Sequence, residues 1–283
     1  MDHPADTAQL ALLCEVAGTP KPGNVDRDRD LEGLRFEHFL AGAVGARGGL
    51  ELAANGAAVG TAFERAVSGM ARQRGGNTQF GALLLLVPLV RAAADDLDRP
   101  VCEAVVADTT VADAAAFYRA FEHVDVFVGE PPTGADALDV RRGAAAVPAV
   151  RDRGLTLRDV LALGADADDV AREWTTGFER SFEAAELIAD ASGSVLDRAA
   201  AAYLRLLADR PDTLVAKRRG MDAAREVQAR AASLVEADAF RVDRAAVATF
   251  ADELVADGIN PGTTADLTAA GLFIALERQA VDV

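Results

Sequence analysis

Thr19-Pro20-Lys21-Pro22-Gly23-Asn24-Val25-Asp26-Arg27 is the stretch around which the rest of the sequence is arranged. Proline fixes its own φ and disfavours the helical conformation in the residue before it, so the helical pattern is expected to stop here. Gly23 permits a positive φ or a close backbone approach. The loop would therefore hold the cation of Lys21, the amide of Asn24 and the carboxylate of Asp26 at nearly fixed separations. Such a set suits a polyphosphate or a metal ion; a helix break with solvated charges is the alternative.

Acidic residues outnumber basic ones by 45 to 29, and only two of the basic residues, Lys21 and Lys217, are lysines. A uniformly acidic surface repels nucleic acid and anionic lipid, so we expect neither as a partner. The composition is similar to that of proteins from extreme halophiles, in which carboxylates keep the surface hydrated and salt screens their repulsion. We therefore expect small molecules as ligands, and a homo-oligomer is compatible with the sequence.

The chain shows no signal-peptide pattern, since Met1 to Thr7 is acidic and polar. The longest apolar run, Ala82 to Val90, contains Pro88 and is too short to span a bilayer. We expect a cytoplasmic protein. Cys14 and Cys102 lie in apolar helical patterns without ligand-like spacing, which predicts buried free thiols rather than a disulfide or a metal site.

Apolar residues recur mainly at three- and four-residue spacings, and Ala and Leu dominate, which predicts an all-α protein. Only Val124 to Val128 has a strand pattern, and it is too isolated to define a sheet. No repeat, linker or composition break occurs, so we expect one compact multi-helix domain over residues 1–283. The expected helices cover about residues 5–17, 36–55, 62–74, 80–94, 109–122, 155–163, 168–174, 178–191, 195–208, 211–237 with a break at Gly220, 243–257 and 263–279.

Two further helix starts carry polar residues beside glycine or proline. Gly75-Gly76-Asn77-Thr78 precedes the apolar helix from Phe80, where Asn77 or Thr78 can cap the free amides or leave them for an anion. Asn260-Pro261-Gly262-Thr263-Thr264-Ala265-Asp266 precedes the last helix, with Thr263 or Thr264 as the expected N-cap and Asp266 in the first turn.

Taken together, Thr19 to Asp26, Gly76-Asn77-Thr78 and Asn260 to Leu267 resemble, in order and spacing, the triphosphoribosyl-dephospho-CoA synthase family. This all-helical family makes the precursor of the prosthetic group of citrate lyase and malonate decarboxylase. Its members show a Thr-Pro-Lys-Pro-Gly loop, an Asn-Thr-His-Lys-Gly segment and a Pro-Gly-Gly-Ser-Ala-Asp-Leu-type loop before the last helix. Pro211-Asp212-Thr213 with Arg219-Gly220 resembles, more weakly, a late Asp and Arg-Gly element.

The chain departs from the family pattern at two places. Gln79-Phe80 stands where the family has His-Lys, so a pair suited to phosphate binding or proton transfer is missing. The family's His and Asp-Met pair after the first loop has no clear match, and the connector offers Asp30 and Glu32 instead. The chain therefore resembles a divergent branch, in which the use of ATP is better supported than dephospho-CoA as the acceptor.

The resemblance implies a reaction that breaks the glycosidic bond of ATP, releases adenine and joins the triphosphoribosyl group to a ribose hydroxyl of dephospho-CoA. This chemistry requires a held triphosphate, usually with Mg²⁺, carboxylates near an oxocarbenium-like centre, and a base for the acceptor's proton. Asp26, Asp30 and Asp266 are the candidates for the catalytic carboxylates, and Asp26 and Asp266 for the Mg²⁺ ligands; the sequence does not divide those roles. The implied nucleotide contacts are Lys21 as the main phosphate contact, Gly23, Asn24, Asn77, Thr78, Asp212, Arg219, Thr263 and Thr264.

Two other functions are consistent with these residues. One is an ATP-dependent ribosyl or phosphoryl transferase that acts on a different acceptor. The other is a helical ligand-binding protein without catalytic activity.

Overall fold

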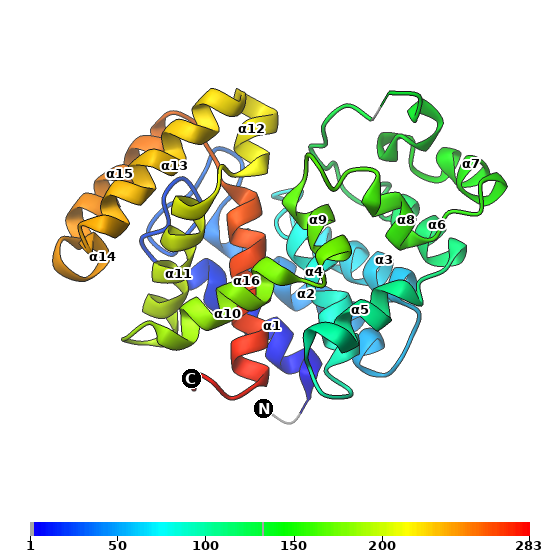
Figure 1. Ribbon diagram of the computed structural model, residues 1–283, viewed down its shortest axis with the longest axis horizontal. Coiled ribbons are helices and arrows are strands. Elements are labelled where there is room, and N and C mark those ends of the chain that lie inside the picture. The colour runs from blue at the N-terminus through cyan, green and yellow to red at the C-terminus, as the bar shows by residue number, and fades with distance from the viewer. Residues whose placement is uncertain (1–2, 132) are drawn as a thin grey trace. The chain divides into compact units, whose positions relative to one another are not determined.

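The computed structural model describes residues 3–131 and 133–283, and α-helices dominate them (Figure 1). The described residues contain no strand, only isolated β-bridges of Asp26 with Arg29 and Leu31 with Leu34. The all-α prediction is therefore confirmed, and residues 124–128 are irregular rather than extended into a strand.

The α-helices are α1 Pro4–Ala17, α2 Phe36–Ala54, α3 Val59–Met70, α4 Phe80–Ala92, α5 Arg99–Ala107, α6 Val111–Ala120, α7 Val147–Asp152, α8 Leu157–Ala162, α9 Asp169–Thr176, α10 Glu179–Asp190, α11 Val195–Asp209, α12 Thr213–Arg219, α13 Met221–Glu236, α14 Ala239–Val242, α15 Arg244–Ala256 and α16 Gly262–Glu277. The 3₁₀ segments η1 Asp136–Leu138 and η2 Val140–Ala146 precede α7.

Many of these helices begin where a side chain from the preceding residue accepts a hydrogen bond from a first-turn amide. Thr110, Thr156 and Ser194 form capping boxes at the starts of α6, α8 and α11, each with an Asp three residues later. Helix α5 was not predicted, although Asp98 caps it and a proline lies in its first turn. Local capping chemistry thus sets the starts of α5, α6, α8, α9, α11, α12 and α15.

The chain divides into two compact units, each discontinuous in sequence. The first comprises the chain up to Gln9 together with Ala41–Arg180, and the second comprises Leu10–Leu40 and Ser181–Val283. The expectation of one domain over residues 1–283 stays a prediction, and each unit is described by itself.

The first unit is built on α3, α4 and α6. Helix α4 is buried along nearly its whole length, and Phe80 at its start lies 5.1 Å from Phe63 of α3 and 4.8 Å from Phe121, measured between ring centroids. Phe117 of α6 completes the cluster. Cys102 is buried and, like Cys14 in the second unit, is a free thiol, as predicted. Among the described helices, none is both long and apolar enough to cross a bilayer.

Two glycines let α2 and α3 approach closely in the first unit. A Cβ on Gly45 would lie 2.2 Å from the carbonyl oxygen of Gly69, and a Cβ on Gly69 would lie 1.9 Å from the carbonyl oxygen of Gly45. Because backbone atoms cannot move aside as a flexible side chain can, both positions require glycine.

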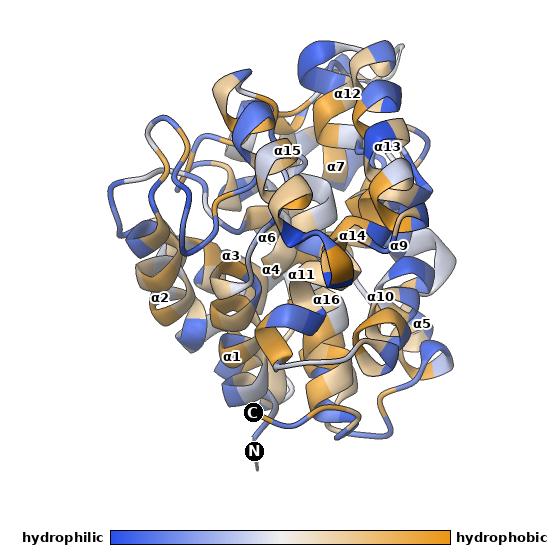
Figure 2. Cartoon of the chain, turned by 90° about the vertical axis from the view of Figure 1, so that its left-hand side faces the viewer, coloured by the Kyte–Doolittle hydropathy of each residue, from blue (hydrophilic) through white to orange (hydrophobic). Residues whose placement is uncertain are grey.

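The second unit is built around α16, which is apolar on several sides and buried along most of its length (Figure 2). It packs against α11 and α12. Tyr203 and Leu207 of α11 form an adjoining core with Val227 of α13 and Phe250 of α15. A smaller cluster of Val16, Val25 and Phe39 anchors the loop that follows α1. The prediction of a buried last helix is confirmed.

We expect Gly45→Ala to lower the free energy of unfolding by about 1–3 kcal/mol, because the added methyl group overlaps backbone atoms of α3. Gly48→Ala, on the same helix, is the matched control. Its nearest neighbour is the movable guanidinium of Arg65, so helix propensity should leave stability unchanged or raise it by up to about 1 kcal/mol. Denaturant unfolding measures both, and equal stabilities would contradict the close approach.

Candidate active site

The side chain of Lys21 lies fully buried in the second unit, between α1 and α11. Its Nζ forms an ion pair with Glu15 Oε1 from α1, donates to Asn24 Oδ1 at 3.3 Å, and lies 5.9 Å from the centroid of the Tyr203 ring. Burial raises the pKa of the Glu15 carboxyl, and the charge and hydrogen bond of Lys21 act in the opposite direction. Glu15 was not predicted from the sequence; its one signal is an acidic residue within an otherwise apolar stretch, Leu10 to Val16.

The loop of Lys21 is joined to the loop before α16. Asn24 Nδ2 donates to Asn260 Oδ1 at 2.9 Å, and the Tyr203 hydroxyl donates to the carbonyl oxygens of Pro22 at 2.8 Å and Pro261 at 3.5 Å. Gly23 has a φ of +72°, and a Cβ there would lie 2.4 Å from the carbonyl oxygen of Ile259. The structure thus brings two of the three motifs together and shows why glycine is required.

Asp26 is fully buried and organises the loop itself. Its Oδ2 accepts from Thr19 Oγ1 at 2.9 Å and from the Lys21 amide at 3.0 Å, and its Oδ1 accepts from the Asp28 amide at 2.9 Å. Arg29 adds an ion pair at 3.3 Å. Four donors therefore already surround this carboxylate.

Asp212 connects the starts of two helices. Its Oδ1 accepts from the amides of Leu214 and Val215 at the start of α12, and its Oδ2 accepts from the amide and hydroxyl of Thr264 in α16, both at 2.8 Å. Burial raises the pKa of the Asp212 carboxyl, while these four hydrogen bonds act in the opposite direction. One carboxylate therefore stabilises two positive helix ends.

The expectation that Thr263 or Thr264 is the N-cap of the last helix is wrong. The N-cap of α16 is Pro261, with no side-chain hydrogen bond, and both threonines lie inside the first turn. Thr263 Oγ1 accepts from Thr213 Oγ1 at 3.1 Å. A local cap is not needed, because Asp212 supplies the acceptor from a distant part of the sequence.

Asp30, Asp266 and Arg219 are the remaining candidates, and no hydrogen bond to Lys21 is seen for Asp30 or Arg219 among the described residues. Asp30 is exposed, and its Oδ1 accepts from the Phe36 amide at 2.8 Å at the start of α2. The expectation that Asp266 lies in the first turn of the last helix is wrong. Helix α16 begins at Gly262 and its first turn contains no acidic residue, so the half-buried Asp266 lies beyond that turn. Arg219 donates to the carbonyl oxygens of Asp257 and Gly258, at 3.0 and 3.2 Å, at the end of α15.

Asn77 and Thr78 belong to the first unit, at the start of α4. The Oδ1 of Asn77 accepts from the Phe80 amide at 3.0 Å, so Asn77 is a helix cap. Gln79 occupies the N-cap position itself, and its own side chain makes no capping hydrogen bond.

The described residues do not form a preformed metal centre. No group of three or more His, Cys, Asp or Glu side chains in residues 3–131 and 133–283 is arranged to hold a metal ion. The oxygens of Asp26 are already bonded to protein donors. A protein-only Mg²⁺ cage, which needs near-octahedral oxygen ligands, therefore does not fit these residues.

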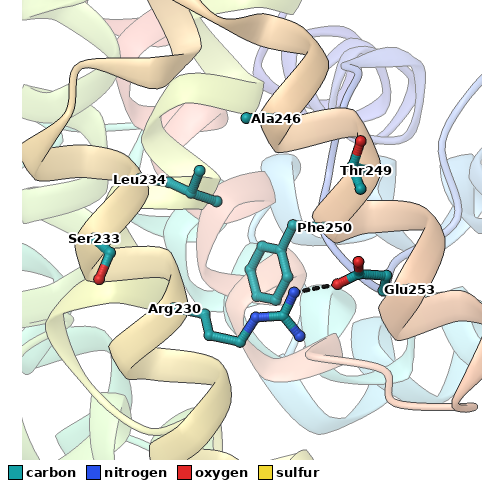
Figure 3. A pocket seen from close by; sticks show the side chains of 7 residues that line it. All are labelled: Arg230, Ser233, Leu234, Ala246, Thr249, Phe250 and Glu253. Carbon is teal, nitrogen blue, oxygen red and sulfur yellow. Dashed lines mark hydrogen bonds and ion pairs between the residues drawn. The ribbon is translucent and has the colours of Figure 1, made fainter.

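A separate hollow of about 380 Å³ lies between α13 and α15 in the second unit (Figure 3). Arg230 lies across the ring of Phe250, 4.4 Å from its centroid, and forms an ion pair with Glu253. None of the residues predicted from the sequence lines this hollow. Arg230 and Glu253 already form an ion pair with each other, so this hollow is not proposed as part of the candidate site.

Comparison with known proteins gives a consistent result. Residues 1–282 match the family model CitG, described as ATP:dephospho-CoA triphosphoribosyl transferase. A solved crystal structure from Archaeoglobus fulgidus, provisionally named a triphosphoribosyl-dephospho-CoA synthase, is 26% identical, with a TM-score of 0.68. The match covers 84% of this chain and 97% of that one. A search of the curated proteins gave no match.

Removing the carboxylate beside Lys21 should strongly destabilise the protein. We expect Glu15→Gln to cost about 3–5 kcal/mol, because it leaves an uncompensated buried ammonium. The double variant Glu15→Leu with Lys21→Met should be far closer to the wild type, since it removes both charges at similar volume. Denaturant unfolding is the measurement.

The control for this pair is Glu37→Gln, which breaks the exposed ion pair of Glu37 with Arg35. It should change stability by less than about 1 kcal/mol. If Glu15→Gln lowers the free energy of unfolding no more than Glu37→Gln does, the buried ion pair is not important for stability.

Asp212→Asn should lower the free energy of unfolding by about 1–3 kcal/mol, because an amide cannot accept the hydrogen bonds that converge on the second carboxylate oxygen. Asp222→Asn is the control, since that side chain is fully exposed in the first turn of α13. Thermal or denaturant unfolding compares the two. Equal stability of both variants would show that α12 and α16 do not depend on the shared carboxylate.

Proposed function

We propose which residues of this chain bind the nucleotide and which residue acts as the base. The premise is that the chain belongs to the family of ATP:dephospho-CoA triphosphoribosyl transferases. The chain is a transferase enzyme, and ATP is a substrate of its family's reaction. In that reaction the bond between the ribose C1′ of ATP and adenine breaks, and C1′ forms a bond to a hydroxyl oxygen of the acceptor. Adenine leaves with the bonding electrons, and the acceptor's proton passes to a base.

The joined loops of the second unit supply the proposed phosphate contacts. Lys21 is the cation of this group, with Asn24 beside it and Gly23 admitting a close backbone approach. An ammonium carries three donors, and Glu15 and Asn24 take two of them, so a third can meet a phosphate oxygen. Because Lys21 is fully buried, this contact requires the loop to open.

Further contacts come from helix starts. Thr263 and Thr264 lie in the first turn of α16, where Thr263 bonds to Thr213 and Thr264 bonds to Asp212. The loop before this turn is hydrogen-bonded to the Lys21 loop through Asn260 and Asn24. Arg219 fixes the end of α15. In the first unit, Asn77 and Thr78 precede α4, where Asn77 caps the Phe80 amide and the N-cap residue makes no side-chain hydrogen bond. These groups stand as our proposed nucleotide contacts.

Among the three candidate carboxylates, we assign the base to Asp266. Asp26 is enclosed by its four donors, and Asp30 is an exposed cap of α2. Asp266 is half-buried and follows two residues after Thr264, which donates its amide and hydroxyl to the Asp212 carboxylate. Any Mg²⁺ would arrive with the ATP phosphates, since Mg²⁺ commonly combines one or two protein carboxylates with phosphate oxygens and water.

The family membership carries this proposal, and the assay is direct. With ATP, Mg²⁺ and dephospho-CoA in molar KCl, the protein should release adenine and form the triphosphoribosyl adduct, both measurable by chromatography and mass spectrometry. High salt is chosen because the net charge is −16. Folded protein without adenine release would refute the assignment. Adenine release that needs a cell extract rather than dephospho-CoA would indicate a different acceptor.

Asp266→Asn should lower kcat by about 10²–10⁴-fold with little change in the KM for ATP, because the variant loses proton transfer rather than binding. Asp222→Asn, at an exposed position, is the matched control and should retain full activity. A wild-type rate in Asp266→Asn would move the base to another carboxylate, and Asp30→Asn is the variant to compare next.

A further inference from the structure

The start of α4 holds polar side-chain atoms that the protein itself does not satisfy. In the part of the chain that the structure describes, Oγ1 of Thr78 and both Oε1 and Nε2 of Gln79 are buried without a hydrogen-bond partner. Gln79 is only 3% exposed. A buried polar group without a partner is costly, and native proteins keep one where a ligand, an ion or an ordered water completes it.

A glycine on α2 makes room for this pair. A Cβ on Gly42 would lie 2.6 Å from Thr78 Oγ1 and 2.8 Å from Gln79 Oε1. Both oxygens therefore lie close to the backbone of α2, in space that a side chain at position 42 would otherwise fill. Thr78 itself is half-buried, and the preceding Gly76 is exposed, so the pair lies close to the surface of the first unit.

The chemistry of Gln79 selects the kind of ligand. A carboxamide presents one acceptor, Oε1, and two N–H donors on Nε2, in one plane. A phosphate would satisfy the donors only and would leave Oε1 facing an anion. A complementary group must carry a donor and an acceptor side by side, as the edge of adenine does with its N6 amino group and the adjacent ring nitrogen.

We propose that Gln79, with Thr78, binds the edge of an adenine ring and makes the enzyme specific for adenine nucleotides. Gln79 Oε1 accepts from the N6 amino group and Nε2 donates to the adjacent ring nitrogen N7. On the same edge guanine presents two acceptors, O6 and N7, so neither orientation of the carboxamide can pair with both. This inference rests on the proposed function, because both ATP and dephospho-CoA contain adenine.

Gln79→Leu tests the proposal, since leucine has a similar size and no polar atoms. Calorimetric titration of the purified protein with ATP, GTP and dephospho-CoA separately needs no turnover. We expect the variant to lose about 5- to 150-fold in affinity for the adenine nucleotide that uses this site, with GTP unaffected. The nucleotide whose affinity falls identifies the source of the ring. Gln279→Leu, the same change at an exposed position, should leave all affinities unchanged.

Stability separates a ligand contact from a structural one. Gln79→Leu should fold at least as stably as the wild type, because it removes two unsatisfied atoms. Unchanged nucleotide affinities in a stable variant would overturn the proposal and leave a buried water as the partner. If Gln79→Leu does not fold, Gln79→Glu serves instead; it keeps the acceptor, loses the donor and should weaken adenine nucleotide binding.

Two further arms complete the test. Weakened binding of 4′-phosphopantetheine, which has amides but no adenine, would show that the site holds the other end of dephospho-CoA and would overturn the adenine assignment. Wild-type protein that binds ATP far more tightly than GTP but releases no adenine would support the site while refuting the proposed reaction.

Discussion

A lysine ammonium that is sealed from water must be neutralised inside the protein, and the second unit satisfies this requirement at Lys21. Glu15 of α1 supplies the charge, Asn24 supplies a second acceptor, and the ring of Tyr203 lies over the cation. Because Tyr203 also donates to the carbonyl oxygens of Pro22 and Pro261, the ion pair and the hydrogen bonds fix one geometry. The loop after α1 and the loop before α16 are therefore positioned together.

The starts of α16 and α4 show two different ways to treat a helix N-terminus. At α16 the amide and hydroxyl of Thr264 are taken by Asp212, an anion that belongs to the protein. At α4 only the Phe80 amide is capped, by Asn77, and the polar atoms of Thr78 and Gln79 remain unsatisfied. At the first start, the Thr264 groups are already bonded within the protein. The second leaves hydrogen-bonding capacity that a substrate can use.

Short-range signals explain which predictions succeeded. The predictions for α1, α2, α11 and α15 agree with the structure to within about two residues, because apolar periodicity and nearby caps or breakers mark their ends. Helix α5 was not predicted, although Asp98 and Pro100 are the residue types that favour a helix start. The short helices α7 and α14 carry too few turns for periodicity to be visible.

The candidate site was predicted less completely than the fold. The loop of Lys21 and the loop of Thr263 were chosen because proline and glycine at a helix boundary signal a fixed backbone, and the structure joins these two loops. Glu15 was missed because a single acidic residue in an apolar helical pattern has no local mark that it faces a buried cation. The Thr263 or Thr264 cap was wrong because its replacement, Asp212, lies about fifty residues away in the chain.

Local patterns in the sequence were enough to establish the helical fold class, the positions of the rigid loops and the family resemblance, because each depends on residues that are neighbours along the chain. The use of Lys21 could be learned only from the folded protein, since its burial depends on Glu15, Asn24 and Tyr203 meeting in space. The same is true of the donors that enclose Asp26 and of the polar atoms at Gln79 that have no partners among the described residues. Burial and hydrogen-bond satisfaction belong to the folded chain, and no local sequence pattern contains them.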